Sequence, residues 1–424
     1  MQTAGDERIA AKLAEALDVA PAPEPRRDER RDTRPDDGLD ARPNAPPGAP
    51  EQDDPDRAHV HGFHTYPARM HPTTASRLVL AATEPGAVVL DPFCGSGTVL
   101  VEAMVAGRQA VGTDLNPLAE RLARLKTAKL DAAEREAMVA GARHVAAFAS
   151  ERRLRRAGAT KRYPPEDVAL FDAHVLLELD SVRAGILGLD APPRLREALA
   201  LVLSSILVKL SRRASDTAAG VSAGAATRRL AAGYPSRLFV KKTVELAGRM
   251  AEFERLVPAG IPSARVTLDD ASRLRTIGSS TIDAVVTSPP YVATYDYLAH
   301  HALRIRWLDL DARPFSEGEM GARRRYGPLD ARAAREEWTR ELGATLRAMA
   351  RVCRAGAPIA LVLADSAVQG EALRADVMIL PLAEEAGLAF RARASQVRPH
   401  FHGPTTQAFQ KVPRAEHAIA LEKR

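Results

Sequence analysis

Two acidic side chains and a glycine loop are spaced as they would be in a sugar-binding site. A short apolar run ends at Asp91, and a loop containing Gly95 and Gly97 follows it directly. A second apolar run ends at Asp114, which comes 19 residues after Gly95. In doubly wound α/β folds, an acid about 20 residues after a glycine-rich turn accepts hydrogen bonds from a ribose, while the glycines let the ligand lie against bare backbone. This spacing predicts a nucleoside site between two strand ends.

The glycine loop differs from two familiar nucleotide-binding motifs. No Lys-Ser or Lys-Thr follows it, which excludes a triphosphate-binding loop. Leu100 stands at the position of the third glycine of the dinucleotide motif. A second feature, the turn Ser288-Pro289-Pro290-Tyr291, follows a strand-like run at 282–286. This turn narrows the chemistry more than the glycine loop does alone.

Three segments together resemble the amino-group DNA methyltransferases, which act on cytosine N4 or adenine N6. Residues 91–98, Asp-Pro-Phe-Cys-Gly-Ser-Gly-Thr, resemble the S-adenosylmethionine loop of that family, and residues 288–291 resemble its catalytic tetrapeptide. Residues 64–69, His-Thr-Tyr-Pro-Ala-Arg, are similar to the segment that closes over the methionine end of the cofactor. The resemblance covers about 60–130 and 265–424 and leaves the middle of the chain unassigned.

The resemblance implies S-adenosylmethionine as the cofactor and assigns residues to it. Asp270 would accept a hydrogen bond from the amino group of the cofactor's adenine, and Asp269 is its close rival. The full set expected to bind the cofactor is Thr65, Tyr66, Asp91, Pro92, Phe93, Gly95, Ser96, Gly97, Thr98, Asp114, Asn116 and Asp270.

The tetrapeptide suits methylation of an exocyclic amine. Such an amine is a poor nucleophile, because its lone pair is delocalised into the ring. Two acceptors, the Ser288 hydroxyl and the Pro289 carbonyl, would hold its N–H groups, Pro290 would stiffen the turn, and Tyr291 would stack on the base. Positioning and electrostatics then carry the rate, so we predict no metal, and the base must leave the duplex.

The identity of the target base follows from the first residue of the tetrapeptide and from the cysteines. By resemblance, family members with serine at this position mostly act on cytosine N4, and those with aspartate or asparagine mostly act on adenine N6. Cytosine C5 chemistry would need a cysteine nucleophile, and neither Cys94 nor Cys353 is suitably placed. We therefore expect a DNA cytosine-N4 methyltransferase, with adenine N6 as the alternative.

The expected fold is an α/β, doubly wound, Rossmann-like methyltransferase sheet with a large helical insertion. Residues 1–58 are expected to be a mostly disordered arm, because 20–58 is rich in Pro, Arg and Asp and nearly lacks large apolar side chains. Residues 59–130 and 263–424 form the two parts of the catalytic domain. The stretch 131–262 has helical periodicity and separates strands that a minimal fold would join directly.

Basic residues suggest where double-stranded DNA would bind. The net charge is +6, and between 131 and 260 Lys and Arg outnumber Asp and Glu by 21 to 15. The insertion is therefore either a DNA-contacting subdomain or a packing unit with solvated arginines. The arginines that suit phosphate or flipped-base contacts are Arg212, Arg213, Arg323, Arg324 and Arg325, the last three beside Tyr326 in a loop expected at 309–335.

Other function classes are less favoured. A tRNA guanine-N2 methyltransferase of related fold usually carries an N-terminal RNA-binding domain and Asp in the tetrapeptide, and a non-enzymatic DNA-binding module need not keep the motif acids. His400 and His402 have no third ligand nearby in sequence, which argues against a metal. Two cysteines and no apolar run near 18 residues predict a cytoplasmic protein without a membrane span. A cognate restriction endonuclease is an expected partner, and the oligomeric state stays open.

Overall fold

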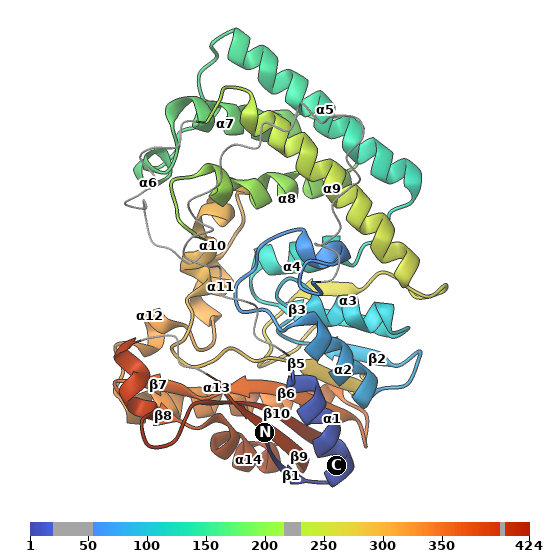
Figure 1. Cartoon of the computed structure of the whole chain (residues 1–424), viewed down its shortest axis with the longest axis vertical. Helices are drawn as coiled ribbons and strands as arrows, with labels where there is room; N and C mark the ends of the chain where they lie inside the picture. The colour runs from blue at the N-terminus through green and yellow to red at the C-terminus, as the bar shows by residue number, and fades with distance from the viewer. Residues whose placement is uncertain (20–53, 216–229, 399–402) are drawn as a thin grey trace.

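The computed structural model describes residues 1–19, 54–215, 230–398 and 403–424. In these ranges one sheet of eight strands crosses the lower half of the molecule (Figure 1), in the order β1-β9-β10-β6-β5-β2-β3-β4. A separate hairpin pairs β7 with β8. The strands are β1 (Gln2–Gly5), β2 (Val88–Asp91), β3 (Gln109–Asp114), β4 (Arg265–Leu268), β5 (Ala284–Thr287), β6 (Pro358–Ala364), β7 (Ser366–Val368), β8 (Glu371–Leu373), β9 (Leu388–Val397) and β10 (Ala415–Lys423).

Helices cover the sheet and form a second group above it (Figure 1). Within the described ranges, none is both long and apolar enough to span a bilayer. The helices are α1 (Glu7–Leu17), α2 (Pro72–Ala82), α3 (Thr98–Val105), α4 (Pro117–Lys126), α5 (Ala132–Leu154), α6 (Pro165–Ala169), α7 (Ala173–Leu187), α8 (Pro193–Leu210), α9 (Tyr234–Leu256), α10 (Tyr297–Trp307), α11 (Arg313–Gly318), α12 (Arg323–Tyr326), α13 (Ala331–Val352) and α14 (Ala375–Glu385), with 3-10 turns η1 (His59–Gly62) and η3 (Gly403–Phe409).

The central strands are buried on both faces, so their side chains divide between two cores. Val89 and Ala360 belong to the core that includes residues of α1, α2 and α3. Leu90 and Ile359, one position away on the same strands, belong to the core built with α13 and α14. Because successive side chains of a strand point to opposite faces, this division gives three layers, helix–sheet–helix.

The strand order confirms the predicted doubly wound, Rossmann-like sheet. Strands β4, β3, β2, β5 and β6 are parallel, whereas β10, β9 and β1 continue the sheet in antiparallel pairs. The chain leaves β2 toward β3 on one side, and β5 lies on the other side. This reversal of strand order is a switch point, and the crevice outside such strand ends is where ligands bind in this kind of fold.

The helical insertion lies between α4 and β4. Helices α5, α7, α8 and α9 pack against one another, and α8 also contacts α4 and α10. A capping box starts α5, because Asp131 Oδ1 accepts from the Glu134 backbone N–H at 2.8 Å and Glu134 Oε2 accepts from that of Asp131 at 3.0 Å. The helices therefore form a unit with its own packing, while the exact division at 131 and 262 stays a prediction.

The N-terminal residues differ from the predicted arm. Residues 2–5 form the edge strand β1, paired with β9 so that Gln2 faces Ser395, and α1 follows it. Leu13 and Leu17 of α1 are buried in the core. The expectation of a mostly disordered arm is wrong for residues 2–17. The part of the expectation that concerns 20–53 lies outside the described residues.

The start of α2 is capped by a histidine. His71 is the N-cap, and its Nδ1 accepts from the Thr73 backbone N–H at 3.2 Å. Pro72 is the first helical residue, a position that proline favours because its fixed φ suits the first turn and no N–H is needed there.

Candidate functional site

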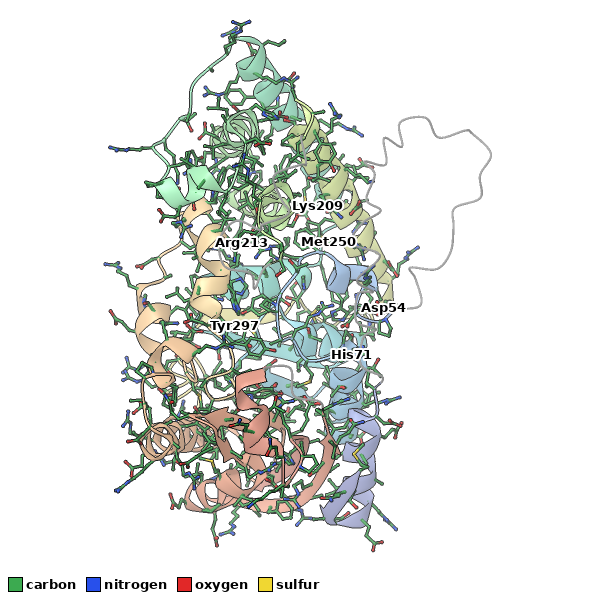
Figure 2. All side chains as sticks on the ribbon, turned by 60° about the vertical axis from the view of Figure 1, so that its left-hand side comes forward. Asp54, His71, Lys209, Arg213, Met250 and Tyr297 are labelled. Carbon is green, nitrogen blue, oxygen red and sulfur yellow. The ribbon has the colours of Figure 1, made fainter. Side chains whose placement is uncertain are left out.

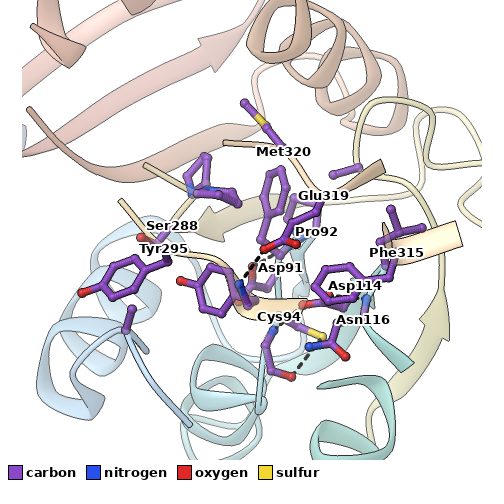
Figure 3. Close-up of a pocket in the computed structure, with 18 of the residues that line it drawn as sticks. Asp91, Pro92, Cys94, Asp114, Asn116, Ser288, Tyr295, Phe315, Glu319 and Met320 are labelled. Carbon is purple, nitrogen blue, oxygen red and sulfur yellow. Dashed lines mark hydrogen bonds between the residues drawn. The ribbon is translucent and has the colours of Figure 1, made fainter. Parts of the chain in front are cut away.

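The predicted segments meet around one cavity of about 250 Å³, at the carboxyl ends of β2, β3 and β5 (Figure 3). Thr65 and Gly97 are outside its lining: Thr65 contacts Arg304, and Gly97 is the N-cap of α3. The predicted cofactor and catalytic residues that line it are Tyr66, Asp91, Pro92, Phe93, Gly95, Ser96, Thr98, Asp114, Asn116, Asp270, Ser288, Pro289, Pro290 and Tyr291.

A hydrogen bond joins the two strand ends that carry the motifs. Thr287 is the residue before the tetrapeptide, and its hydroxyl donates to Asp91 Oδ1 at 2.6 Å. The Phe93 backbone N–H donates to the same oxygen at 3.1 Å. Asp91 is only 4% exposed, and burial raises its pKa from 3.8 to about 7. A carboxylate in so dry a position interacts strongly with any cation that enters the cavity.

Asp114 holds the glycine loop in place. Its Oδ2 accepts from the Gly95 backbone N–H at 2.9 Å, and its Oδ1 accepts from that of Asn116 at 2.8 Å. Burial raises the pKa of Asp114 to about 6. The side chain therefore fixes the loop that it faces across the cavity, and each carboxylate oxygen keeps a further lone pair for a ligand.

The glycine loop requires glycine at its second position. Gly97 has φ of +88°, and a Cβ there would lie 3.0 Å from Ala123 Cα of α4. We expect Gly97→Ala to lower the free energy of unfolding by about 1–3 kcal/mol, because it adds left-handed strain and a clash. Chemical denaturation measures the change. Gly260→Ala is the matched control, because it shares a positive φ of +87° without any atom near its Cβ. An equal loss of unfolding free energy in both variants would mean that backbone strain alone, and not the clash with Ala123, destabilises Gly97→Ala.

The turn after β4 distinguishes Asp269 from Asp270. Asp269 Oδ2 accepts from both the backbone N–H and the hydroxyl of Thr276, at 2.6 and 2.7 Å, and its Oδ1 accepts from the Asp270 backbone N–H at 2.8 Å. Asp270 is less buried, and its Oδ1 accepts from Ser272. Asp269 is thus occupied in holding the turn, which favours Asp270 for the predicted contact with adenine.

The tetrapeptide forms the wall of the cavity beyond β5 (Figure 3). Pro289 is buried, whereas Ser288, Pro290 and Tyr291 are half-buried. The Tyr291 hydroxyl lies 3.4 Å from Glu416 Oε1. Burial and the Glu416 carboxylate raise the pKa of Tyr291, while its hydrogen bond with Ser288 lowers it. The turn is therefore anchored at both ends and presents the serine to the cavity.

Further aromatic residues border the cavity that sequence reasoning did not assign. Tyr295 and Tyr297 line it with Tyr66, and the Tyr295 and Tyr297 ring centroids are 5.6 Å apart. Tyr66 stacks on His301 with centroids 4.8 Å apart. A chain with only 4% aromatic residues places three tyrosines here. Two of them could have been found from the sequence, because Tyr295-Asp296-Tyr297 follows shortly after the tetrapeptide. Flat rings at a cavity mouth suit a nucleobase.

A buried arginine fixes the closing segment from the side of the insertion. Arg304 of α10 is fully buried, and its Nη2 donates to Thr65 Oγ1 at 3.2 Å while its Nε donates to the Ser204 carbonyl at 3.3 Å. The neighbouring His64 Nε2 lies 3.1 Å from Ser204 Oγ of α8. The segment expected to cover the cofactor is thus tied to α8 and α10.

We expect Arg304→Met to weaken S-adenosylmethionine binding about tenfold, because a charged hydrogen-bond donor contributes about 1.5–3 kcal/mol to the position of its partners. Calorimetric titration measures the affinity. The exposed Arg313, whose partner is Asp311, supplies the control Arg313→Met. Unchanged affinity in the Arg304 variant would mean that residues 64–69 keep their position without this contact.

The first pair of predicted DNA-contacting arginines follows α8. Arg212 forms an ion pair with Asp172, Nη2 to Oδ1 at 2.5 Å, and remains partly exposed. Arg213 lies on the same side of the molecule as Tyr297 (Figure 2) and is near enough to lower the pKa of His301. The position of Arg213 close to the aromatic residues is compatible with the predicted contact, which stays a prediction.

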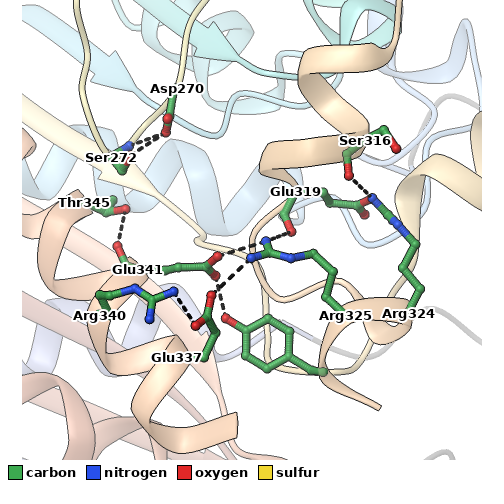
Figure 4. A network of polar contacts seen from close by, with 11 residues as sticks. Asp270, Ser272, Ser316, Glu319, Arg324, Arg325, Glu337, Arg340, Glu341 and Thr345 are labelled. Carbon is green, nitrogen blue, oxygen red and sulfur yellow. Dashed lines mark hydrogen bonds and ion pairs between the residues drawn. The ribbon is translucent and has the colours of Figure 1, made fainter. Parts of the chain in front are cut away.

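The second group is held internally (Figure 4). Arg324 pairs with Asp296 and Glu319, and Arg325 pairs with Glu337 at 3.1 Å and Glu341 at 2.9 Å. The expected loop at 309–335 instead contains α11 and α12. Arg323 donates to the carbonyls of Ala293 and Thr294, and Arg325 lines the cavity.

The predicted role of Tyr326, as an aromatic beside the arginines that contacts a nucleotide, is wrong. Tyr326 is fully buried, and its hydroxyl donates to Glu341 Oε2. The two acids that hold Arg325 lie on α13, one turn apart at Glu337 and Glu341, so this partnership is not visible from local sequence. Arg324 and Arg325 therefore shape the wall next to the tetrapeptide, and the DNA contact proposed for the triplet has lost its aromatic partner.

Comparison with known families adds an independent observation. A family model of the N6 and N4 methylases, described as DNA methylase, matches residues 39–124 of the 424-residue chain. The match includes the closing segment, the glycine loop and Asp114. Over these residues the chain is similar to the amino-methyltransferases of DNA. S-adenosylmethionine is the cofactor of this family, as predicted.

Curated proteins match the chain over short stretches. The type II methyltransferase M.MvaI of Kocuria varians is 36% identical over 75 residues, which are 17% of this chain and 16% of the relative. A tRNA (guanine(10)-N2)-dimethyltransferase of Methanothermobacter thermautotrophicus is 42% identical over 52 residues, 12% of this chain and 16% of the relative. A solved methyltransferase of Methanosarcina mazei aligns over 85% of this chain and 98% of its own, with 10% identity and a TM-score of 0.32. The curated matches thus span about a sixth of each relative.

Proposed function

We propose that this chain transfers the methyl group of S-adenosylmethionine to the exocyclic N4 amine of a cytosine in double-stranded DNA. One observation carries the proposal: the glycine loop and the Ser288 turn share one cavity at the switch point, joined by the hydrogen bond from Thr287 to Asp91 of 2.6 Å. A nucleoside cofactor and an amine-holding turn then face each other. The family match supports methyl transfer, and the serine-first tetrapeptide supports cytosine N4.

The residues present fit the cofactor. Thr98 Oγ1 is buried beside the cavity and has no hydrogen-bond partner among the described residues, so a ligand group would satisfy it. The first N–H groups of α3 meet the cavity at the same place and suit the methionine carboxylate. Asp114 and Asp270 would hold the ribose and the adenine. S-adenosylmethionine supplies a methyl group that its sulfonium has already activated.

The chain's own groups hold and orient the target amine. The Ser288 hydroxyl and the Pro289 carbonyl accept hydrogen bonds from the two N–H groups of the amine. These contacts hold the nitrogen so that its lone pair points out of the base plane, toward the methyl group. The buried Asp91 carboxylate gives this step a preorganised electrostatic environment. A base reaches the turn only after it has left the duplex, and Tyr291 and Tyr295 offer rings on which it stacks.

The test is incubation of the protein with labelled S-adenosylmethionine and unmodified genomic DNA, followed by mass analysis of the nucleosides. N4-methylcytosine is the expected product. N6-methyladenine would keep the reaction and correct the base. Label in tRNA but not in DNA would overturn the DNA substrate and move the chain to the guanine-N2 activity that its methanogen relative is named for.

A proposed partner follows from the same relatives. Because they include a type II methyltransferase, we propose a cognate restriction endonuclease that cuts the unmethylated site. A DNA substrate would place the enzyme in the cytoplasm. Transformation of a host that lacks this methyltransferase with the candidate endonuclease should be lethal, and co-expression should restore growth.

A further inference from the structure

Two histidines and a glutamate converge just ahead of the closing segment. His59 and His61 belong to η1, and Glu102 belongs to α3. One donor atom from each side chain lies within 4.8 Å of the other two. His61 Nε2 is 2.7 Å from Glu102 Oε1, and the two imidazole centroids are 4.8 Å apart. Residues 41 positions apart in sequence thus direct three metal-ligating groups at one point.

A buried nitrogen atom in this cluster lacks a hydrogen-bond partner among the described residues. His59 is 7% exposed and His61 is 1% exposed. Among the described residues, Nδ1 of His59 has no hydrogen-bond partner, whereas His61 already meets Glu102 through Nε2. Buried polar atoms are rarely left in this state. His59 also has a φ of +30°, a conformation that costs energy for a residue with a side chain and that clusters at ligand sites.

The cluster is reachable from solvent. A surface hollow is lined by the three side chains together with Thr73 and Ser76. A water molecule from this hollow can reach the three donor atoms. Three protein ligands and one open position form the usual arrangement of a zinc site with two histidines and one carboxylate.

We propose that His59, His61 and Glu102 bind a divalent metal of the zinc class, with water from the hollow as the fourth ligand. Imidazole and carboxylate donors suit zinc, and the ligating imidazoles must be neutral. Of the nearby cations, Arg69 pairs with Asp56 at 3.2 Å, Arg249 donates to the His59 carbonyl at 2.9 Å, and Arg77 lines the hollow.

The metal would act on structure rather than on methyl transfer. It would join η1, which leads into residues 64–69, to α3, which begins at the glycine loop. Its site is separate from the cofactor cavity, whose lining contains none of the three ligands. Binding should therefore stabilise the fold and set the start of the closing segment.

A second cluster provides a contrast. Asp365, Asp376 and His417 also lie within reach of one another. Here Arg374 pairs with Asp365 at 2.7 Å, and Arg393 pairs with Asp376, so cations of the protein already neutralise the acids. We assign this cluster to structure, and it serves as an internal control.

The test uses the full chain without a histidine tag, freed of metal with a chelator and titrated calorimetrically with zinc chloride. We expect one zinc per chain and a higher melting temperature. Glu102→Gln keeps the volume and a hydrogen bond to His61 but replaces the carboxylate, so zinc affinity should fall at least tenfold. His144→Asn removes an exposed histidine of α5 and should change nothing.

Several outcomes would overturn the proposal. They are no saturable zinc binding by the wild type, equal affinity in wild type and Glu102→Gln, or loss of binding only in Asp376→Asn. Because the readout is metal binding, it does not depend on whether the chain methylates DNA. A failure here would leave the proposed function untouched, and the reverse also holds.

Discussion

Replacement of Ser288 by alanine should lower the rate of methyl transfer about 100-fold and leave S-adenosylmethionine affinity nearly unchanged. The hydroxyl is one of two acceptors that hold the target amine, and the removal of a preorganised hydrogen-bonding group costs about this much in other enzymes. The serine lines the cavity at the end of β5, whereas the residues expected to bind the cofactor are carried mainly by β2, β3 and the turn after β4. Catalysis and cofactor binding should therefore separate in this variant.

Single-turnover kinetics and calorimetry measure the two quantities independently. Ser205→Ala is a matched control, because Ser205 of α8 is half-buried and its hydroxyl donates only within its own helix, to the Val202 carbonyl. A Ser288 variant that loses cofactor affinity as strongly as rate would contradict the division of roles. A variant with a normal rate would remove Ser288 from the catalytic turn.

The strands and the cavity lining were predictable because the signals are local. The apolar runs before Asp91, Asp114 and Ser288 each end at a residue that faces the cavity. Parallel strands bring their carboxyl ends to one edge of a sheet, so three separate motifs imply one site once the sheet is assumed. The observed strand order places β2, β3 and β5 side by side, so their three motifs do meet at one edge of the sheet.

The remaining features depend on partners that are distant in sequence. β1 is short and mostly exposed, so it lacks the apolar alternation that identifies a strand. Arg304 lies in a helix, where an arginine is expected to face solvent, yet it is buried against Thr65. The acids that pair with Arg325 are identified only once folding has brought α13 alongside it.

Replacement of Asp91 by asparagine should stabilise the cofactor-free protein at pH 8. Burial raises the pKa of this carboxyl from 3.8 to about 7. Between these values the folded state binds the proton and the unfolded state does not, so stability falls as pH rises from about 4 to about 7. Each pKa unit corresponds to 1.36 kcal/mol, which sets an upper limit of about 4 kcal/mol for the cost of ionising Asp91 above pH 7. Asparagine avoids this cost and keeps an oxygen for Thr287 and Phe93.

Denaturant unfolding at pH 5 and pH 8 checks the sign. Asp91→Asn should already be more stable than wild type at pH 5, where the unfolded carboxyl is ionised, and its advantage should grow by about 2–3 kcal/mol between pH 5 and pH 8. Asp190→Asn alters an exposed acid after α7, and its stability relative to wild type should not change between pH 5 and pH 8. A variant less stable than wild type at pH 8 would mean that the ionised carboxylate stabilises the empty site.

The same substitution should weaken S-adenosylmethionine binding at least tenfold, because the cofactor's sulfonium and ammonium groups lose a buried anion. In the wild type the affinity should fall as pH drops below about 7, since a protonated Asp91 must first release its proton. The variant should lack this dependence on the Asp91 proton. Gained stability and lost affinity in one residue would show that the chain keeps a costly charge in its core because the cofactor needs it.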